Sequence, residues 1–191
     1  LVGSYAGDAL TDADYNTAIG YLALSGDTLG SRSVAIGRSA LQVQNFTTAT
    51  NAYNVGIGFQ TGDSITTGVE NVLVGGLAGD ALTDADYNIA IGTAALSADT
   101  LGSRSIAIGQ GALGAQNFTT ATDTYNVAVG YGAGDSVTTG IQNTLIGSLA
   151  GDSLTDADFN TAVGMSALGA DTLGSRSVAI GSGALSSQNL T

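Results

Sequence analysis

The stretch Asn88-Ile89-Ala90-Ile91-Gly92 is one copy of a short apolar run that closes on glycine, and the run recurs throughout the 191-residue chain. Its copies end at Gly3, Gly20, Gly37, Gly58, Gly75, Gly92, Gly109, Gly130, Gly147, Gly164 and Gly181. Successive glycines follow one another at 17-residue steps, interrupted twice by a 21-residue step, and the pattern closes as a 72-residue super-repeat. A unit this short cannot bury a core of its own, so such units stack on their neighbours into a solenoid.

Within each run, β-branched residues stand two positions apart, as Ile89 and Ile91 do, with a small residue between them. Alternate residues of a strand share a face, so the β-branched pair lies on one face and Ala90 on the other. Because neither face carries a charge, we expect both to be covered, one by the coil's own core and one by another chain. The glycine that follows permits a bend or a close backbone approach that a Cβ would obstruct.

Two further residue types keep fixed positions in the unit. Ala stands three positions after the glycine in ten of the eleven units. Asn stands four positions before the glycine at Asn16, Asn54, Asn71, Asn88, Asn126, Asn143 and Asn160. Stacked Asn side chains can hydrogen-bond from coil to coil, and Asn also tolerates the left-handed backbone of a sharp turn. The polar second half of the coil, such as residues 63–68, predicts a second short strand followed by a turn.

The pattern therefore predicts an all-β fold: a β-solenoid, or β-roll, of about eleven coils, with 17/17/21/17-residue coils in each 72-residue super-repeat. The apolar period of two and the scarcity of Lys and Glu argue against helices. We expect residues 1–191 to form a single continuous array without a domain boundary. Because the chain begins and ends inside a unit, we expect it to be a fragment of a longer fibre protein.

Composition disfavours several function classes. The formal net charge is −12, with four Arg and no Lys, so the chain repels phosphate backbones and lacks the basic clusters that bind anionic lipid. No apolar run approaches the roughly 20 residues of a membrane-spanning helix. Without Cys or His, the chain also lacks the usual zinc ligands and nucleophile–base pairs. We therefore expect no nucleic-acid partner, no membrane insertion and no enzymatic activity.

The strongest candidate site is the motif Thr-Asp-Ala-Asp-Tyr/Phe-Asn, at residues 11–16, 83–88 and 155–160. Its carboxylates and its Asn carbonyl are oxygen ligands of the kind that Ca²⁺ takes. The candidate calcium ligands are Asp12, Asp14, Asp84, Asp86, Asp156 and Asp158. Calcium takes about six to eight oxygens and the motif supplies about three, so a solvated acidic turn is the alternative. No other cofactor is expected.

A second motif, Asp-Thr-Leu-Gly-Ser-Arg-Ser, holds three of the four Arg residues, at 27–33, 99–105 and 171–177. In so acidic a chain we expect these arginines to pair with carboxylates, within one chain or across subunits.

A third motif, Gln-Asn-Phe-Thr-Thr-Ala-Thr, contains the four extra residues of the 21-residue coil, at 44–50 and 116–122, and is followed by Tyr53 and Tyr125. We expect this segment to bulge from the rod and to cover an edge of the roll with its aromatic residue. A sugar-binding aromatic platform is the alternative.

The string Asn88-Ile89-Ala90-Ile91-Gly92-Thr93-Ala94-Ala95-Leu96 resembles the repeat of trimeric autotransporter adhesin heads, in which Asn-Ser-Val-Ala-Ile-Gly precedes a turn of small residues. Residues 105–109 and 177–181 resemble it equally well. Residues 130–147 resemble repeats of phage tail fibres and of bacterial fibre proteins that carry a C-terminal intramolecular chaperone domain. The resemblance covers the whole chain, although adhesin heads repeat at a shorter interval than the 17-residue and 21-residue units found here.

This resemblance implies a parallel homotrimer of three β-rolls around one axis, in an extracellular attachment fibre on a cell or virion surface. It implies a shaft or stalk that spaces a binding tip from its base, with host glycan or protein bound by other parts of the fibre. Turns that recur in every 72-residue copy also suit a scaffold better than one shaped pocket. The alternatives are a self-assembling surface filament, an adhesive head that binds glycans or partner surfaces through repeated turns, a calcium-dependent β-helix carbohydrate-active enzyme and an ice-binding protein.

Overall fold

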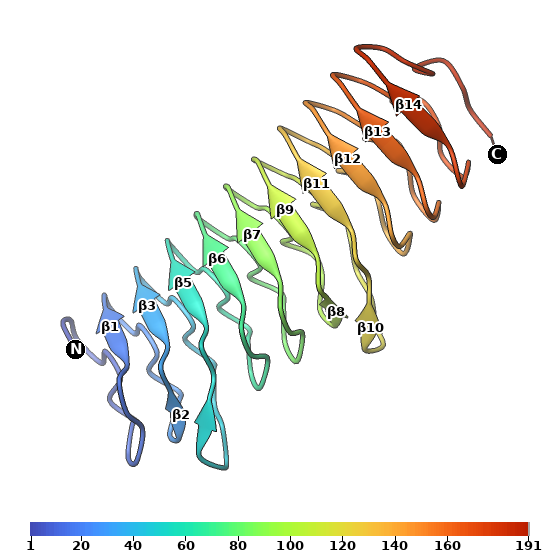
Figure 1. The fold of residues 1–191 in the computed structure, drawn as a ribbon. Coiled ribbons are helices and arrows are strands. Elements are labelled where there is room, and N and C mark those ends of the chain that lie inside the picture. The colour runs from blue at the N-terminus through green and yellow to red at the C-terminus, as the bar shows by residue number, and fades with distance from the viewer. Residues whose placement is uncertain (191) are drawn as a thin grey trace.

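The chain forms a rod of stacked coils, as the glycine spacing predicts (Figure 1). The computed structural model describes residues 1–190, and no helix in that range could cross a membrane. Ten parallel strands, in chain order along the rod, form the main sheet. They are β1 (Thr17–Ile19), β3 (Val34–Ile36), β5 (Val55–Ile57), β6 (Val72–Val74), β7 (Ile89–Ile91), β9 (Ile106–Ile108), β11 (Val127–Val129), β12 (Thr144–Ile146), β13 (Thr161–Val163) and β14 (Val178–Ile180).

The solenoid therefore has about ten turns, where the glycine count predicts about eleven coils. The difference lies at the first unit, which contributes only an isolated bridge between Val2 and Ile19. All other strands pair at one register, so that each position lies over its equivalent in the next coil. Ala90 of β7 pairs with Ala107 of β9, and Ala107 pairs with Ala128 of β11 across a 21-residue step. The extra residues of the longer coil are thus accommodated outside the main sheet.

The core lies on the alanine face of this sheet. Ala90 and Ala107 are fully buried, and they pack in one cluster with residues from the opposite side of the coil, such as Leu96. The β-branched residues point the other way, because they alternate with alanine along each strand. Ile91 is 37% exposed even though its equivalents in the neighbouring coils stack against it. The structure thus assigns the coil's own core to the alanine face and leaves the β-branched face outside.

The glycine that ends each strand is required by the closeness of the coils. Gly92 has a φ of +135°, a region that side chains rarely adopt, and a Cβ there would lie 2.5 Å from the carbonyl oxygen of Gly109. The same arrangement recurs in the next coils, and it permits each glycine N–H to donate along the rod. The Gly92 N–H donates to the Val74 carbonyl oxygen at 2.8 Å. Without a side chain at this corner, the backbone turns sharply and the ladder continues.

The asparagine ladder is present and lies inside the coil. Asn71 is fully buried, and its backbone N–H donates to the side-chain oxygen of Asn54 at 2.9 Å. Its side-chain amide donates to the carbonyl oxygen of Ala85 at 2.8 Å, so it also satisfies the turn that precedes Asn88 in the next coil. The expectation that Asn itself is left-handed is wrong. The left-handed residue is the one before it, such as Glu70 (φ 56°) or Tyr87 (φ 60°).

The second half of the coil is mostly turns, so the second strand predicted there is wrong for most coils. Residues 63–68 contain no strand. Short strands occur only beside the longer coils, where β2 (Gly30–Ser31) pairs with β4 (Thr50–Asn51) and β8 (Gly102–Ser103) pairs with β10 (Thr122–Asp123). The longer coils bulge beyond their neighbours at this edge, as expected (Figure 1). A two-residue strand forms here because the insertion provides backbone that the 17-residue coil lacks.

Substitutions at two glycines, one at the corner after a strand and one with open space around it, test whether the corner itself requires glycine. Gly92→Ala should lower the free energy of unfolding by about 3 kcal/mol, because it combines a disfavoured φ with a clash against the next coil. Gly76→Ala should be neutral or stabilise by about 0.5 kcal/mol, because a Cβ at Gly76 meets nothing within 4 Å. Chemical denaturation of both variants measures the difference. Equal stability would contradict the assignment of the glycine row to a tight coil-to-coil contact.

Candidate functional site

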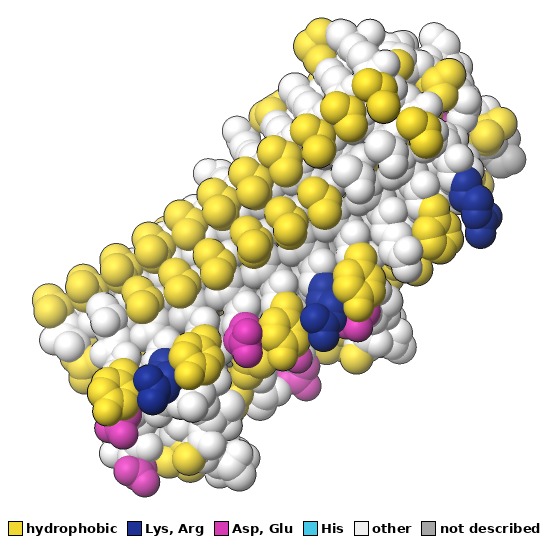
Figure 2. Space-filling view, in the orientation of Figure 1, with side chains coloured by type: hydrophobic (Ala, Val, Ile, Leu, Met, Phe, Trp, Pro, Cys, Tyr) yellow, Lys and Arg dark blue, Asp and Glu magenta, His cyan; other side chains and the backbone are white. Residues whose placement is uncertain are grey.

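The most extensive surface feature is a row of β-branched side chains that we call the apolar stripe. It forms two parallel lines, of which one runs the length of the rod and the other, in which Thr replaces Val or Ile towards both ends, is shorter (Figure 2). One line is Val2, Ile19, Ile36, Ile57, Val74, Ile91, Ile108, Val129, Ile146, Val163 and Ile180; the other is Thr17, Val34, Val55, Val72, Ile89, Ile106, Val127, Thr144, Thr161 and Val178. Neither line contains a charged residue. An apolar surface this long and continuous marks an interaction site more often than a solvated face.

A second line of side chains lies along another edge of the rod, and we call it the aromatic ladder (Figure 2). It consists of the residue before each Asn or Ser: Tyr15, Arg32, Tyr53, Glu70, Tyr87, Arg104, Tyr125, Gln142, Phe159 and Arg176. All ten have a positive φ, which places successive side chains in the same direction. Aromatic rings alternate with charged or amide groups. Three of the four arginines of the chain lie in this ladder.

The arginines of the aromatic ladder stack on the neighbouring rings. The guanidinium carbon of Arg32 lies 4.7 Å from the ring centre of Tyr15, and that of Arg104 lies 4.6 Å from the ring centre of Tyr87. Each such contact is worth about 0.5–1 kcal/mol at an exposed site. The sequence suggested a carboxylate partner for each arginine. Arg104 does pair with Asp123 at 3.0 Å, but Arg32 donates to the side-chain oxygen of Asn51 instead.

The aspartates of the Asp-Thr-Leu-Gly motif do not pair with its arginines but lie inside the coil. Asp27 is fully buried. Its carboxylate accepts hydrogen bonds from the backbone N–H groups of Gly30 (3.0 Å) and Phe46 (3.2 Å), and from the side-chain amide of Gln44 (2.6 Å). Asp99 makes the equivalent bonds one super-repeat later. These carboxylates hold the bulged coil against its neighbour, and the Phe46 side chain covers them, being only 5% exposed.

The candidate calcium ligands are distributed over three separate turns rather than brought together. Asp86 accepts a hydrogen bond from the Val69 N–H at 2.8 Å, and Asp84 accepts bonds from the hydroxyls of Thr66 and Thr67 in the preceding coil. Asp158 binds the Ile141 N–H in the same way. Within residues 1–190, no three acidic, His or Cys side chains gather in a group that could hold a metal ion. Three of the six candidate carboxylates, those of Asp84, Asp86 and Asp158, thus have coil-to-coil partners in the protein, and calcium binding stays a prediction.

Two pairs of aspartates occupy one position in neighbouring coils. Asp63 lies beside Asp80, and Asp135 lies beside Asp152. One carboxylate oxygen of Asp63 and one of Asp80 are buried without a hydrogen-bond partner in the described part of the chain. Burial raises the pKa of both groups, and the charge of Asp63 raises the pKa of Asp80 further. A hydrogen bond from Gln60 and the charge of Arg38 oppose the rise in the pKa of Asp63.

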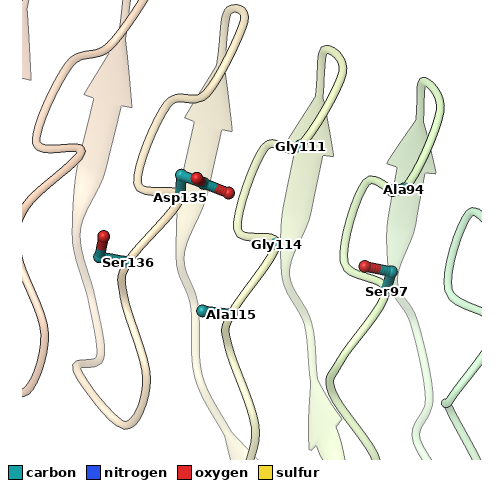
Figure 3. A pocket seen from close by; sticks show the side chains of 7 residues that line it. All are labelled: Ala94, Ser97, Gly111, Gly114, Ala115, Asp135 and Ser136. Carbon is teal, nitrogen blue, oxygen red and sulfur yellow. The ribbon is translucent and has the colours of Figure 1, made fainter.

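A hollow of about 450 Å³ interrupts the regular surface between β7 and β11 (Figure 3). Ser97 and Asp135 point toward each other from two coils, across an intervening coil that has only glycine at positions 111 and 114. Ala94, Ala115 and Ser136 complete the lining. A second hollow of about 200 Å³ adjoins it, shares Gly111 and Asp135, and is lined also by Gln110, Tyr131, Gly132 and Leu149. The sequence motifs do not indicate this site, because it is formed where the side chains of other coils are replaced by glycine.

Known proteins provide no guide to these surfaces. Comparison of the chain with models of protein families, with curated proteins and with solved structures finds no match.

The Asp63–Asp80 pair predicts an unusual dependence of stability on pH. A carboxyl whose pKa is higher in the folded than in the unfolded chain binds protons more tightly when folded. Its contribution to stability therefore falls as the pH rises from the pKa of the unfolded chain through the pKa of the folded chain. Replacing Asp80 by Asn removes one charge and places an amide donor beside Asp63. We expect Asp80→Asn to raise the melting temperature at pH 7 and to flatten the rise in stability on acidification toward pH 4.

Melting curves between pH 4 and pH 7 test this prediction. Asp12→Asn, which removes an exposed aspartate instead, serves as the control and should leave the pH dependence as it is in the parent chain. A lower melting temperature for Asp80→Asn at pH 7, or a pH dependence equal to that of the parent chain, would show that the charged Asp63–Asp80 pair does not destabilise the fold.

Proposed function

We propose that this chain is the structural shaft of an extracellular or virion attachment fibre, in which three parallel copies associate and space a binding tip from its base. The observation that supports the proposal is the apolar stripe, which runs along a rod-shaped protomer with no charged residue in either line. With strands about 4.8 Å apart, ten coils extend about 50 Å, and a stripe about 10 Å wide offers on the order of 500 Å² per protomer. The stripe lengthens with each added coil.

A second copy of this chain is the partner that best fits the stripe. The side chains repeat at the rise of the coils, so a partner matches them along the whole length only if its own side chains repeat at the same rise. Another copy meets this condition by construction. The stripe is also one strand wide, and a narrow stripe is buried completely when several copies place it on a shared axis. The resemblance to trimeric fibre repeats implies that the number of copies is three.

The remaining surfaces suit an exposed shaft. The charged residues in Figure 2 lie along the aromatic ladder and the turns beside it, away from the apolar stripe. A net charge of −12 keeps such a rod soluble and opposes side-by-side association of fibres. Coil-to-coil hydrogen bonds and the buried asparagine ladder link each coil to the next. Stacked parallel coils of this kind resist bending because every coil contacts its neighbours over its full cross-section.

Sedimentation velocity tests the proposal, because it reports both mass and shape. The chain should sediment as an elongated particle of about three times its 18.7 kDa mass. Ile91→Asp combined with Ile108→Asp places two carboxylates in the apolar stripe, and burying an unpaired charge costs several kcal/mol. This variant should sediment as a folded monomer.

Val43→Asp provides the matched control. Val43 is a β-branched residue with 47% exposure that lies outside the stripe, so the substitution places a single carboxylate on the rod without touching the interface. It should leave the particle mass at three copies. A parent chain that stays monomeric at micromolar concentration, or a compact assembly unaffected by the stripe substitutions, would refute the proposed shaft.

A further inference from the structure

We propose that the double hollow around Gly111, Gly114 and Asp135 is a binding site for a neutral sugar residue. This inference goes beyond the shaft function and does not depend on it. It rests on a place where the surface of the rod stops repeating, and on the chemistry of the groups that line it.

The hollow exists because one super-repeat has smaller side chains than the one before it. At the equivalent positions of the first 72-residue super-repeat, the coil has Ser39, Gln42 and Val43 in place of Gly111, Gly114 and Ala115. Two of the flanking groups are the same in both copies, because Ser25 corresponds to Ser97 and Asp63 to Asp135, whereas Leu22 stands in place of Ala94. The first super-repeat thus has these two groups with the centre between them filled. The second has the same two groups with the centre open.

Two further differences between the super-repeats release the carboxylate of Asp135 from its neighbours. In the first super-repeat the side-chain amide of Gln60 donates to Asp63 at 3.3 Å, and the charge of Arg38 acts on the same carboxylate. At the equivalent positions the second super-repeat has Gly132 and Gln110. Asp135 therefore loses the amide donor and the nearby cation together. It extends instead over Gly114, where the position of an added Cβ would lie 2.7 Å from its carboxylate oxygen.

The lining groups suit a ligand with several hydroxyls. A carboxylate accepts hydrogen bonds from neighbouring hydroxyls, while the hydroxyls of Ser97 and Ser136 and the amide of Gln110 can both donate and accept. Tyr131 lines the smaller hollow and is 58% exposed, so its ring can pack against the apolar face of a sugar. Among the described residues no cation lines either hollow, which disfavours an anionic ligand. The two hollows, of about 450 and 200 Å³, are open to solvent, so a sugar residue would rest on the surface of the rod with one face exposed.

Saturation-transfer NMR on the whole 191-residue chain tests the site, with free glucose, galactose, mannose and N-acetylglucosamine as probes at about 10 mM. At least one sugar should show transfer. Gly114→Gln should abolish it, because it restores the side chain that fills the centre in the first super-repeat. Asp135→Asn should weaken binding about tenfold, because a hydrogen bond to a charged acceptor is lost.

Gly169→Gln is the control for the glycine substitution. Gly169 occupies the position of Ser97 one super-repeat later, in the same row of the rod and outside both hollows, and it has no positive φ. This variant should bind sugar as the parent chain does, and melting curves for both glutamine variants show that each is folded. Transfer to none of the four sugars, or binding that survives Gly114→Gln in a folded protein, would overturn the proposal. So would loss of binding in Gly169→Gln.

Discussion

Hydrogen bonding between successive coils is the constraint on which the rest of this structure depends. Each coil must present its N–H and C=O groups at the same height and angle as the coil before it, because an unpaired buried backbone group is costly. Every position therefore repeats its backbone conformation along the rod. Where that conformation is one that side chains rarely adopt, as at Gly92, the residue is glycine in each coil. The same constraint keeps bulky residues such as Tyr87 in the left-handed region, which they would otherwise avoid.

The repeat also determines how polar groups are treated inside the coil. Asn71 is buried without penalty because its side-chain amide donates to the carbonyl oxygen of Ala85 and its side-chain oxygen accepts a hydrogen bond from the Asn88 N–H. Asp27 remains buried because three donors meet its carboxylate. Insertion of four residues is tolerated for a related reason. The bulged coil provides the Gln44 and Phe46 groups that satisfy and cover this carboxylate, so that the longer coil is tied to the rod instead of hanging free.

The features that follow from periodicity could be predicted from the sequence. The spacing of glycines predicts the parallel stack, the Val/Ile alternation predicts two distinct faces, and the recurring Asn predicts a ladder. Features that depend on which residue of a neighbouring coil contacts a given side chain could not be predicted from the sequence. A lone Asp99 five residues before Arg104 suggests an ion pair, whereas the fold turns Asp99 inward and brings Asp123 to the arginine. The hollow at Gly114 is a difference between copies, and alignment of the two super-repeats residue by residue is the signal that could have found it.

The alanine face of the main sheet is the inside of the coil, and thermal melting of Ala107→Glu tests this assignment most directly. Ala107 is fully buried between coils and a carboxylate there has no partner, so we expect this variant to lose the folded state at temperatures where the parent chain is intact. Asp123→Ala changes an exposed position in the same super-repeat and removes a surface ion pair worth less than about 1 kcal/mol. It should melt close to the parent chain. Equal melting of the two variants would contradict the assignment of the alanine face to the core.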